Sequence, residues 1–95
     1  MAFSIIKKAF SPDYELANGI IKTRHLDGND PDITKKVSRL RIDYTVKDAV
    51  YELLAAAIIK EKRLNKSNPG ITEKIKQLKI DDNVKKGIYK ILRIP

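Results

Sequence analysis

The clearest hydrophobic pattern in the chain lies in its middle, between residues 46 and 64. Apolar residues recur there at a spacing of three or four, which is the period of a helix. They form a main stripe, Val46, Ala49, Val50, Leu53 and Ala57, and a second one, Tyr51, Ala55 and Ile58. Thr45 and Asp48 match a capping box at the start of this helix. A helix that is apolar on most of its circumference must be covered on several sides. The pattern predicts a helix that is either central to the fold or, through residues 46–59, the core of a homodimer.

Two segments on the N-terminal side carry the same helix-start signal, Ser-Pro-Asp at 11–13 and Asp-Pro-Asp at 30–32. A capping side chain, a proline at the first helical position and an acid in the first turn all favour a helix N-terminus. We expect one helix over 11–25, which ends where Asp-Gly-Asn-Asp makes a turn, and another over 31–42.

The segment 38–45 also fits a strand. Four apolar residues alternate there with polar ones: Leu40, Ile42, Tyr44 and Val46 against Arg39, Arg41, Asp43 and Thr45. Alternation with a period of two is typical of a half-buried strand. We prefer the helix over 31–42 because its start signal is explicit, and the strand at 38–45 remains the alternative.

The C-terminal third predicts two short helices after the loop Asn-Lys-Ser-Asn-Pro-Gly at 65–70. Thr72 is expected to cap the first of them, and Asp81 or Asp82 the second, which runs to about Arg93. No internal repeat is expected. A chain of 95 residues with 42% apolar residues can bury one core, so we predict a single all-α domain, 1–95, of four to five helices.

The last predicted helix has two opposite faces. Val84, Ile88 and Ile91 lie within one narrow arc, and Lys86, Lys90 and Arg93 lie opposite, flanked by Lys85 and Tyr89. The preceding helix and turn add Lys74, Lys76 and Lys79. This pair of helices resembles a helix-turn-helix motif, which places its second helix in the major groove. The resemblance implies groove or phosphate contacts from Lys86, Lys90 and Arg93 and backbone contacts from Lys74 and Lys76. We add the neighbouring Lys79, Lys85 and Tyr89 to the predicted nucleic-acid-binding residues.

The distribution of charge favours the same function. The net charge is +8, and residues 60–95 hold eleven Lys or Arg against four Asp or Glu, whereas residues 1–59 hold nine against eight. A strong positive charge indicates a polyanionic partner. We therefore expect a non-enzymatic nucleic-acid-binding protein with a regulatory or accessory role. DNA rather than RNA is the first candidate ligand, and we expect the protein to be a dimer.

A second hypothesis for nucleic-acid binding depends on the strand at 38–45. A strand followed by two helices resembles a ribbon-helix-helix protein, which pairs its strand with that of a second copy and lays the ribbon in the major groove. By that resemblance Arg39, Arg41 and Asp43 would face the bases.

The sequence gives little support for a catalytic site or a metal-binding site. The chain has no cysteine, and its one histidine, His25, lies beside a turn. The cluster of Asp27, Asn29, Asp30 and Asp32 lacks the glycine at the sixth position and the closing glutamate of a calcium-binding hand loop. No phosphate-binding loop, dinucleotide fingerprint or zinc-protease motif occurs. We expect no enzyme activity, cofactor, metal or small-molecule substrate.

The same features leave a different class of function open. No apolar run is long enough to span a membrane and the start does not fit a signal peptide, so we expect a cytoplasmic protein without a membrane partner. Such a protein could also use its basic face as a protein-interaction module or inhibitor that binds an acidic protein. A phage, plasmid or mobile element would be a suitable source for it.

Overall fold

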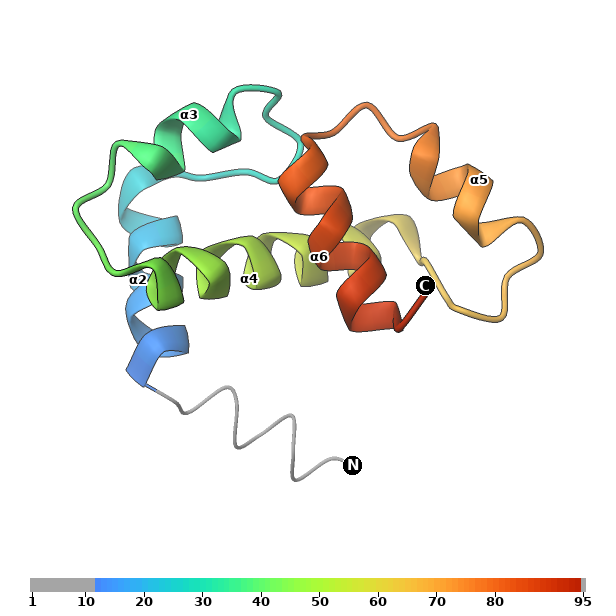
Figure 1. The fold of residues 1–95 in the computed structure, drawn as a ribbon, viewed down its shortest axis with the longest axis horizontal. Helices are drawn as coiled ribbons and strands as arrows, with labels where there is room; N and C mark the ends of the chain where they lie inside the picture. The colour runs from blue at the N-terminus through green and yellow to red at the C-terminus, as the bar shows by residue number, and fades with distance from the viewer. Residues whose placement is uncertain (1–11, 95) are drawn as a thin grey trace.

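The computed structural model describes residues 12–94, and this part of the chain contains five helices and no strand (Figure 1). They are α2 (Pro12–Arg24), α3 (Ile33–Ser38), α4 (Tyr44–Lys62), α5 (Ile71–Lys76) and α6 (Asp82–Leu92). The predicted all-α fold with a long central helix is confirmed. The start of the first predicted helix, at Ser11, lies outside the described residues.

Helix α4 is the centre of the molecule. It packs against α2 on one side and against α6 on another, and these are the two extensive helix–helix contacts (Figure 1). Six of its apolar residues are buried: Val46, Ala49, Val50, Leu54, Ala55 and Ile58. Because other helices of the same chain cover this stripe, the burial does not require the homodimer that was predicted through residues 46–59. A dimer through that face is not shown.

Helix α3 is shorter than predicted, and the strand alternative is wrong. α3 ends at Ser38 rather than at residue 42, and residues 39–43 form an irregular connection to α4. Ile42 of this connection packs against the core. In a continued helix, Ile42 would lie away from the buried face that Ile33 and Val37 form. The irregular backbone instead lets its side chain reach the core. The backbone turns at Arg39 and bends at Leu40 and Ile42, so this segment lacks the extended conformation of a strand.

The helix caps differ in part from the sequence signals. Asp43 rather than Thr45 is the N-cap of α4, and Gly70 rather than Thr72 precedes α5. Gly70 has φ of 67°, a left-handed conformation that glycine adopts at little cost. The predicted cap of the last helix is confirmed, because the side chain of Asp81 accepts a hydrogen bond from the backbone N–H of Asn83.

The expectation that the chain has no internal repeat is wrong. Residues 16–53 (repeat 1) and 54–91 (repeat 2) align without a gap and are identical at sixteen of 38 positions. In repeat 1 these are Leu16, Ala17, Ile20, Ile21, Lys22, Leu26, Pro31, Ile33, Thr34, Lys36, Leu40, Ile42, Asp43, Val46, Lys47 and Tyr51. The bounds of α5 are those of α3 shifted by 38 residues, and α6 begins 38 residues after α4. Each repeat is therefore the end of one long helix, a loop, a short helix and the start of the next long helix.

The backbone hydrogen bonds recur with the same shift. Leu26 N–H donates to the carbonyl of Ile21 at 3.0 Å, and Leu64 N–H donates to that of Ile59 at 2.9 Å. These bonds close the left-handed helix ends at His25 and Arg63, which both have φ of 53°. The side chains of Asp27 and Asn65 then accept from the backbone N–H two residues ahead, at 3.0 and 3.1 Å. The same local sequence thus produces the same loop twice.

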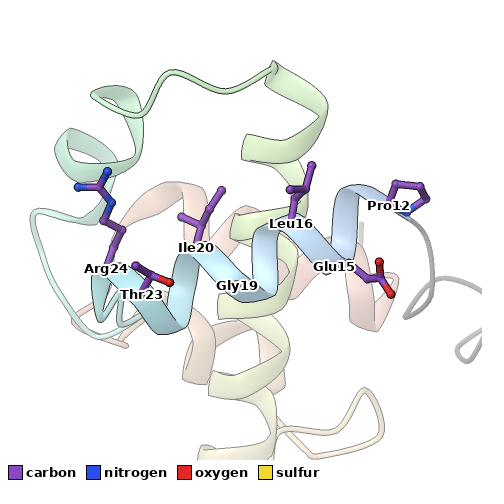
Figure 2. Close-up of a pocket in the computed structure, with 7 residues that line it drawn as sticks. All are labelled: Pro12, Glu15, Leu16, Gly19, Ile20, Thr23 and Arg24. Carbon is purple, nitrogen blue, oxygen red and sulfur yellow. The ribbon is translucent and has the colours of Figure 1, made fainter.

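The environments of the two repeats differ. In repeat 2, Leu54 is 3% exposed and Ile58 is 2% exposed, and Gly28 of the preceding loop lies against both residues. Of the matching residues of repeat 1, Ile20 is half-buried beside α3, whereas Leu16 lies on an open side of α2 (Figure 2). No described loop covers that side as Gly28 covers α4, and Leu16 is 58% exposed. Consecutive packing of each unit on the next is the arrangement of helical repeat proteins.

Candidate nucleic-acid interface

The two repeats carry very different charge. Repeat 1 has seven Lys or Arg and six Asp or Glu, whereas repeat 2 has ten against four. Part of this difference comes from two replacements at matching positions, Asp48 by Lys86 and Glu52 by Lys90. The cationic surface predicted from the sequence is thus a property of the second repeat.

Helix α6 presents Lys86 away from the core, and Arg93, its left-handed C-cap residue, is exposed just beyond the end of the helix. Val84 and Ile88 are fully buried on the opposite side of the helix, while Lys86 and Arg93 are exposed. Within the helix, the separation of Lys86 from Val84 and Ile88 follows the helical period, as predicted. The place of Arg93 does not follow from that period, because its backbone is left-handed. The third residue of the predicted apolar arc, Ile91, is 40% exposed.

Lys85 has a structural role. Its ammonium donates a hydrogen bond to the backbone carbonyl of Lys76 at 2.8 Å, and its side chain is half-buried. That carbonyl is the last of α5, where the helix leaves acceptors without an internal partner. Lys85 therefore ties the end of α5 to α6, and is less available to a ligand than the sequence suggested.

Two further predicted residues have ionic partners. Lys90 Nζ lies 3.1 Å from Glu52 Oε1 on α4, and Glu52 is 17% exposed. Lys76 Nζ lies 3.8 Å from Glu73 Oε1 one turn earlier in α5. The first pair links α6 to the central helix. The second is an exposed pair, of the kind that contributes little to stability.

Four predicted cations make no side-chain ion pair or hydrogen bond within residues 12–94: Lys74, Lys79, Lys86 and Arg93. All four are exposed. Tyr89 is half-buried and packs against the core, so its ring is only partly open to a ligand. These four cations are the part of the predicted site that the structure leaves free.

The helix-turn-helix resemblance is not confirmed. α6 makes its extensive helix contact with α4, and the segment 77–81 connects it to α5. The start of α6 is held by the other repeat, since Thr34 Oγ1 donates to Asp81 Oδ1 at 2.7 Å and accepts from Asn83 Nδ2 at 2.9 Å. In a helix-turn-helix motif this end of the second helix contacts the bases. Here it contacts α3.

Two groups of cations lie outside the eight residues predicted for the C-terminal helices, although Arg39 and Arg41 were expected to face the bases under the ribbon-helix-helix alternative. Lys60, Lys62, Arg63 and Lys66 are exposed at the end of α4 and in the loop after it. Arg24, Arg39 and Arg41, with Lys36, line a hollow beside α3. Self-alignment of the sequence would have drawn attention to them, because several occupy matching positions in the two repeats.

The acidic loop of repeat 1 is a turn held by its own side chains. Asp30 pairs with Lys36, and this hydrogen bond lowers the pKa of Asp30 and raises the pKa of Lys36. Asn29 donates from its side chain to Asp27 at 3.1 Å and to Glu61 of α4 at 3.3 Å. Within residues 12–94 no three His, Asp or Glu residues are arranged to hold a metal ion.

No described helix is both long and apolar enough to cross a membrane. Comparisons of the chain with models of protein families, with characterised proteins and with solved structures give no match.

Proposed function

We propose that the protein is a non-enzymatic nucleic-acid-binding protein, with a regulatory or accessory role, that contacts phosphates through the cations of repeat 2 and through Arg93, which follows this repeat. The observation that carries the proposal is the set of four exposed cations without a protein partner, Lys74, Lys79, Lys86 and Arg93. Cations that are neither paired nor buried keep their full attraction for phosphate. Repeat 2 has only four carboxylates, so its excess of cations favours a polyanion as the ligand.

The chemistry of these residues favours binding with modest sequence preference. Lysine acts on phosphate as a point charge, and arginine is the better reader of base edges. Only one of the four free cations is an arginine. Duplex DNA is the first candidate, and each phosphate contact adds about 0.9 to the slope of log affinity against log salt.

A double charge reversal tests this proposal. Lys79→Glu with Lys86→Glu should weaken binding of a random 20-base-pair duplex by more than about tenfold at 0.1 M salt. The matched control is Lys22→Glu with Lys35→Glu in repeat 1, which makes the same change in net charge. Lys90 is unsuitable, since a glutamate there would face Glu52 and disturb the contact between α4 and α6.

Fluorescence anisotropy at two salt concentrations, with duplex DNA and with a 20-nucleotide RNA, gives the affinities and the preferred nucleic acid. Circular dichroism shows that the fold persists. Equal affinities for the wild type and the Lys79/Lys86 variant would contradict the proposal.

A second candidate function is supported by the tandem helical repeat. Helical repeats build extended surfaces that commonly bind other proteins, and the cations of repeat 2 would then select an acidic partner. Polyglutamate serves as the probe for this alternative. Binding of polyglutamate at a salt concentration at which neither DNA nor RNA binds would favour the protein-interaction module.

A further inference from the structure

A hollow beside α3 gathers most of the cations of repeat 1. It lies among the end of α2, α3 and the segment 39–42, and it is lined by Ile20, Arg24, Leu26, Lys36, Arg39, Leu40, Arg41 and Ile42. Figure 2 shows the side chain of Arg24 extending from the last turn of α2 on the side of α3. Four of the eight lining residues are basic, and none is acidic.

The three arginines of the hollow are free to bind a ligand. Lys36 is engaged by Asp30, but the guanidinium groups of Arg24, Arg39 and Arg41 make no ion pair or hydrogen bond within residues 12–94. All three are exposed, whereas the four apolar residues of the hollow are half-buried. Arginine matches the geometry of phosphate with two parallel N–H groups. The hollow therefore offers guanidinium groups around an apolar floor.

The comparison of the repeats shows where positive charge recurs. Of the seven Lys or Arg of repeat 1, five are matched by Lys in repeat 2: Lys22 by Lys60, Arg24 by Lys62, Lys36 by Lys74, Arg41 by Lys79 and Lys47 by Lys85. Of the six acids, only Asp43 is matched by an acid, Asp81, and both are N-caps. Most cationic positions of repeat 1 are therefore cationic in repeat 2 as well, whereas most of its acidic positions are not acidic there.

Three of the five retained pairs belong to the hollow. Lys62, Lys74 and Lys79 are the counterparts of Arg24, Lys36 and Arg41, and two of them, Lys74 and Lys79, are among the free cations of repeat 2. Only Arg39 has changed to an uncharged residue, Gln77. The same places in the repeat therefore carry positive charge in both copies.

We propose that the hollow is a phosphate-binding site held by Arg24, Arg39 and Arg41, and that it extends the nucleic-acid contact of repeat 2 onto repeat 1. The extension to nucleic acid rests on the proposed function, while binding of a phosphate group does not. A nucleic-acid strand would meet equivalent cations twice, once in each repeat.

The test removes the arginine charge without reversing it. Arg24→Gln with Arg41→Gln should weaken binding of the 20-base-pair duplex about tenfold and reduce the salt slope by about 2. The matched control is Lys22→Gln with Lys35→Gln, which removes the same charge from the same repeat outside the hollow. The control should lose less than about threefold and keep its salt slope. Equal losses in the two variants would overturn the extension onto repeat 1.

A direct measurement separates this proposal from the proposed function. Arginine Nε–H signals of the wild-type protein are followed by NMR during titration with inorganic phosphate and, separately, with ATP. Shifts confined to Arg24, Arg39 and Arg41 support the site. If the protein binds neither DNA nor RNA and these signals still shift, the proposed function fails while the phosphate site stands. Absence of any shift with phosphate, ATP and duplex overturns the site, whatever the result for Lys79 and Lys86.

Discussion

The two repeats have helices at matching positions but different surroundings. Leu16 and Leu54 occupy the same place in the repeat, yet the first is 58% exposed and the second 3% exposed. The difference arises because α2 and the loop after it lie against α4 and cover Leu54. No described segment covers Leu16 on α2 in the same way. Local sequence therefore determines the shape of each unit, and position in the series determines how much each residue stabilises the whole.

The same comparison separates the residues of the fold from those of the surface. Positions that are identical in both repeats include most of the core and the proline before each short helix. The acids of repeat 1 have mostly been replaced in repeat 2, some of them by lysine. Charge could change because exposed side chains contribute little to stability. The two copies can thus share one arrangement of helices while they differ strongly in charge.

The largest expected effect is at the matched leucines. Leu54→Ala should lower the free energy of unfolding by about 3 kcal/mol, because it leaves a cavity in a packed core. Leu16→Ala should cost less than about 0.5 kcal/mol, since that side chain is mostly in water. Urea unfolding followed by circular dichroism measures both. Similar losses at the two positions would mean that α2 is covered as α4 is.

A second contrast uses two helical glycines. A Cβ on Gly87 would lie 2.8 Å from the Cβ of Ala55, whereas one on Gly19 would meet nothing within 4 Å. Gly87→Ala should destabilise the protein by about 1–2 kcal/mol, because α6 must move away from α4. Gly19→Ala should stabilise it by about 0.5–1 kcal/mol, through the lower entropy of the unfolded chain. Thermal unfolding of the two variants should give shifts of opposite sign.

The two N-caps provide a smaller contrast. Asp81 accepts hydrogen bonds from Asn83 and Thr34, whereas the side chain of Asp43 makes no capping hydrogen bond. Asp81→Ala should cost about 1 kcal/mol and Asp43→Ala a few tenths. Hydrogen exchange at the first turns of α4 and α6 localises the effect. A larger loss at Asp43 would show that the contact between α3 and α6 adds nothing.

The smallest effect concerns acid. The pKa of Asp30 is lowered below its ordinary value of 3.8 by the hydrogen bond from Lys36, so the charged form is favoured in the folded protein. The stabilisation is present near neutral pH and is lost as the pH falls through the range below about 4. Repeat 2 has Asn68 at this place. Asp30→Asn should remove this contribution, which NMR titration of the carboxyl carbon in the wild type can check.

The hydrophobic pattern was sufficient to predict the long helix, its central place and the two short C-terminal helices. The proline and aspartate signals located the helix starts to within a few residues, because caps and dipoles act locally. The pattern did not give the end of α3, since that end depends on Ile42 turning towards the core. The repeat was present in the sequence, but it becomes visible only when the chain is aligned with itself.

By itself the sequence determined the helical class, the excess of cations after residue 60 and the opposite faces of the last helix, all of which follow from composition and local periodicity. Only the tertiary structure decided which cations are free. Lys85 and Lys90 cannot be told from Lys86 in the sequence. In the structure, Lys85 donates a hydrogen bond to the carbonyl at the end of α5, and Lys90 pairs with Glu52. It also brought Arg24 beside Arg39 and Arg41. The reason is physical, because partners far apart in the chain meet only when the helices pack.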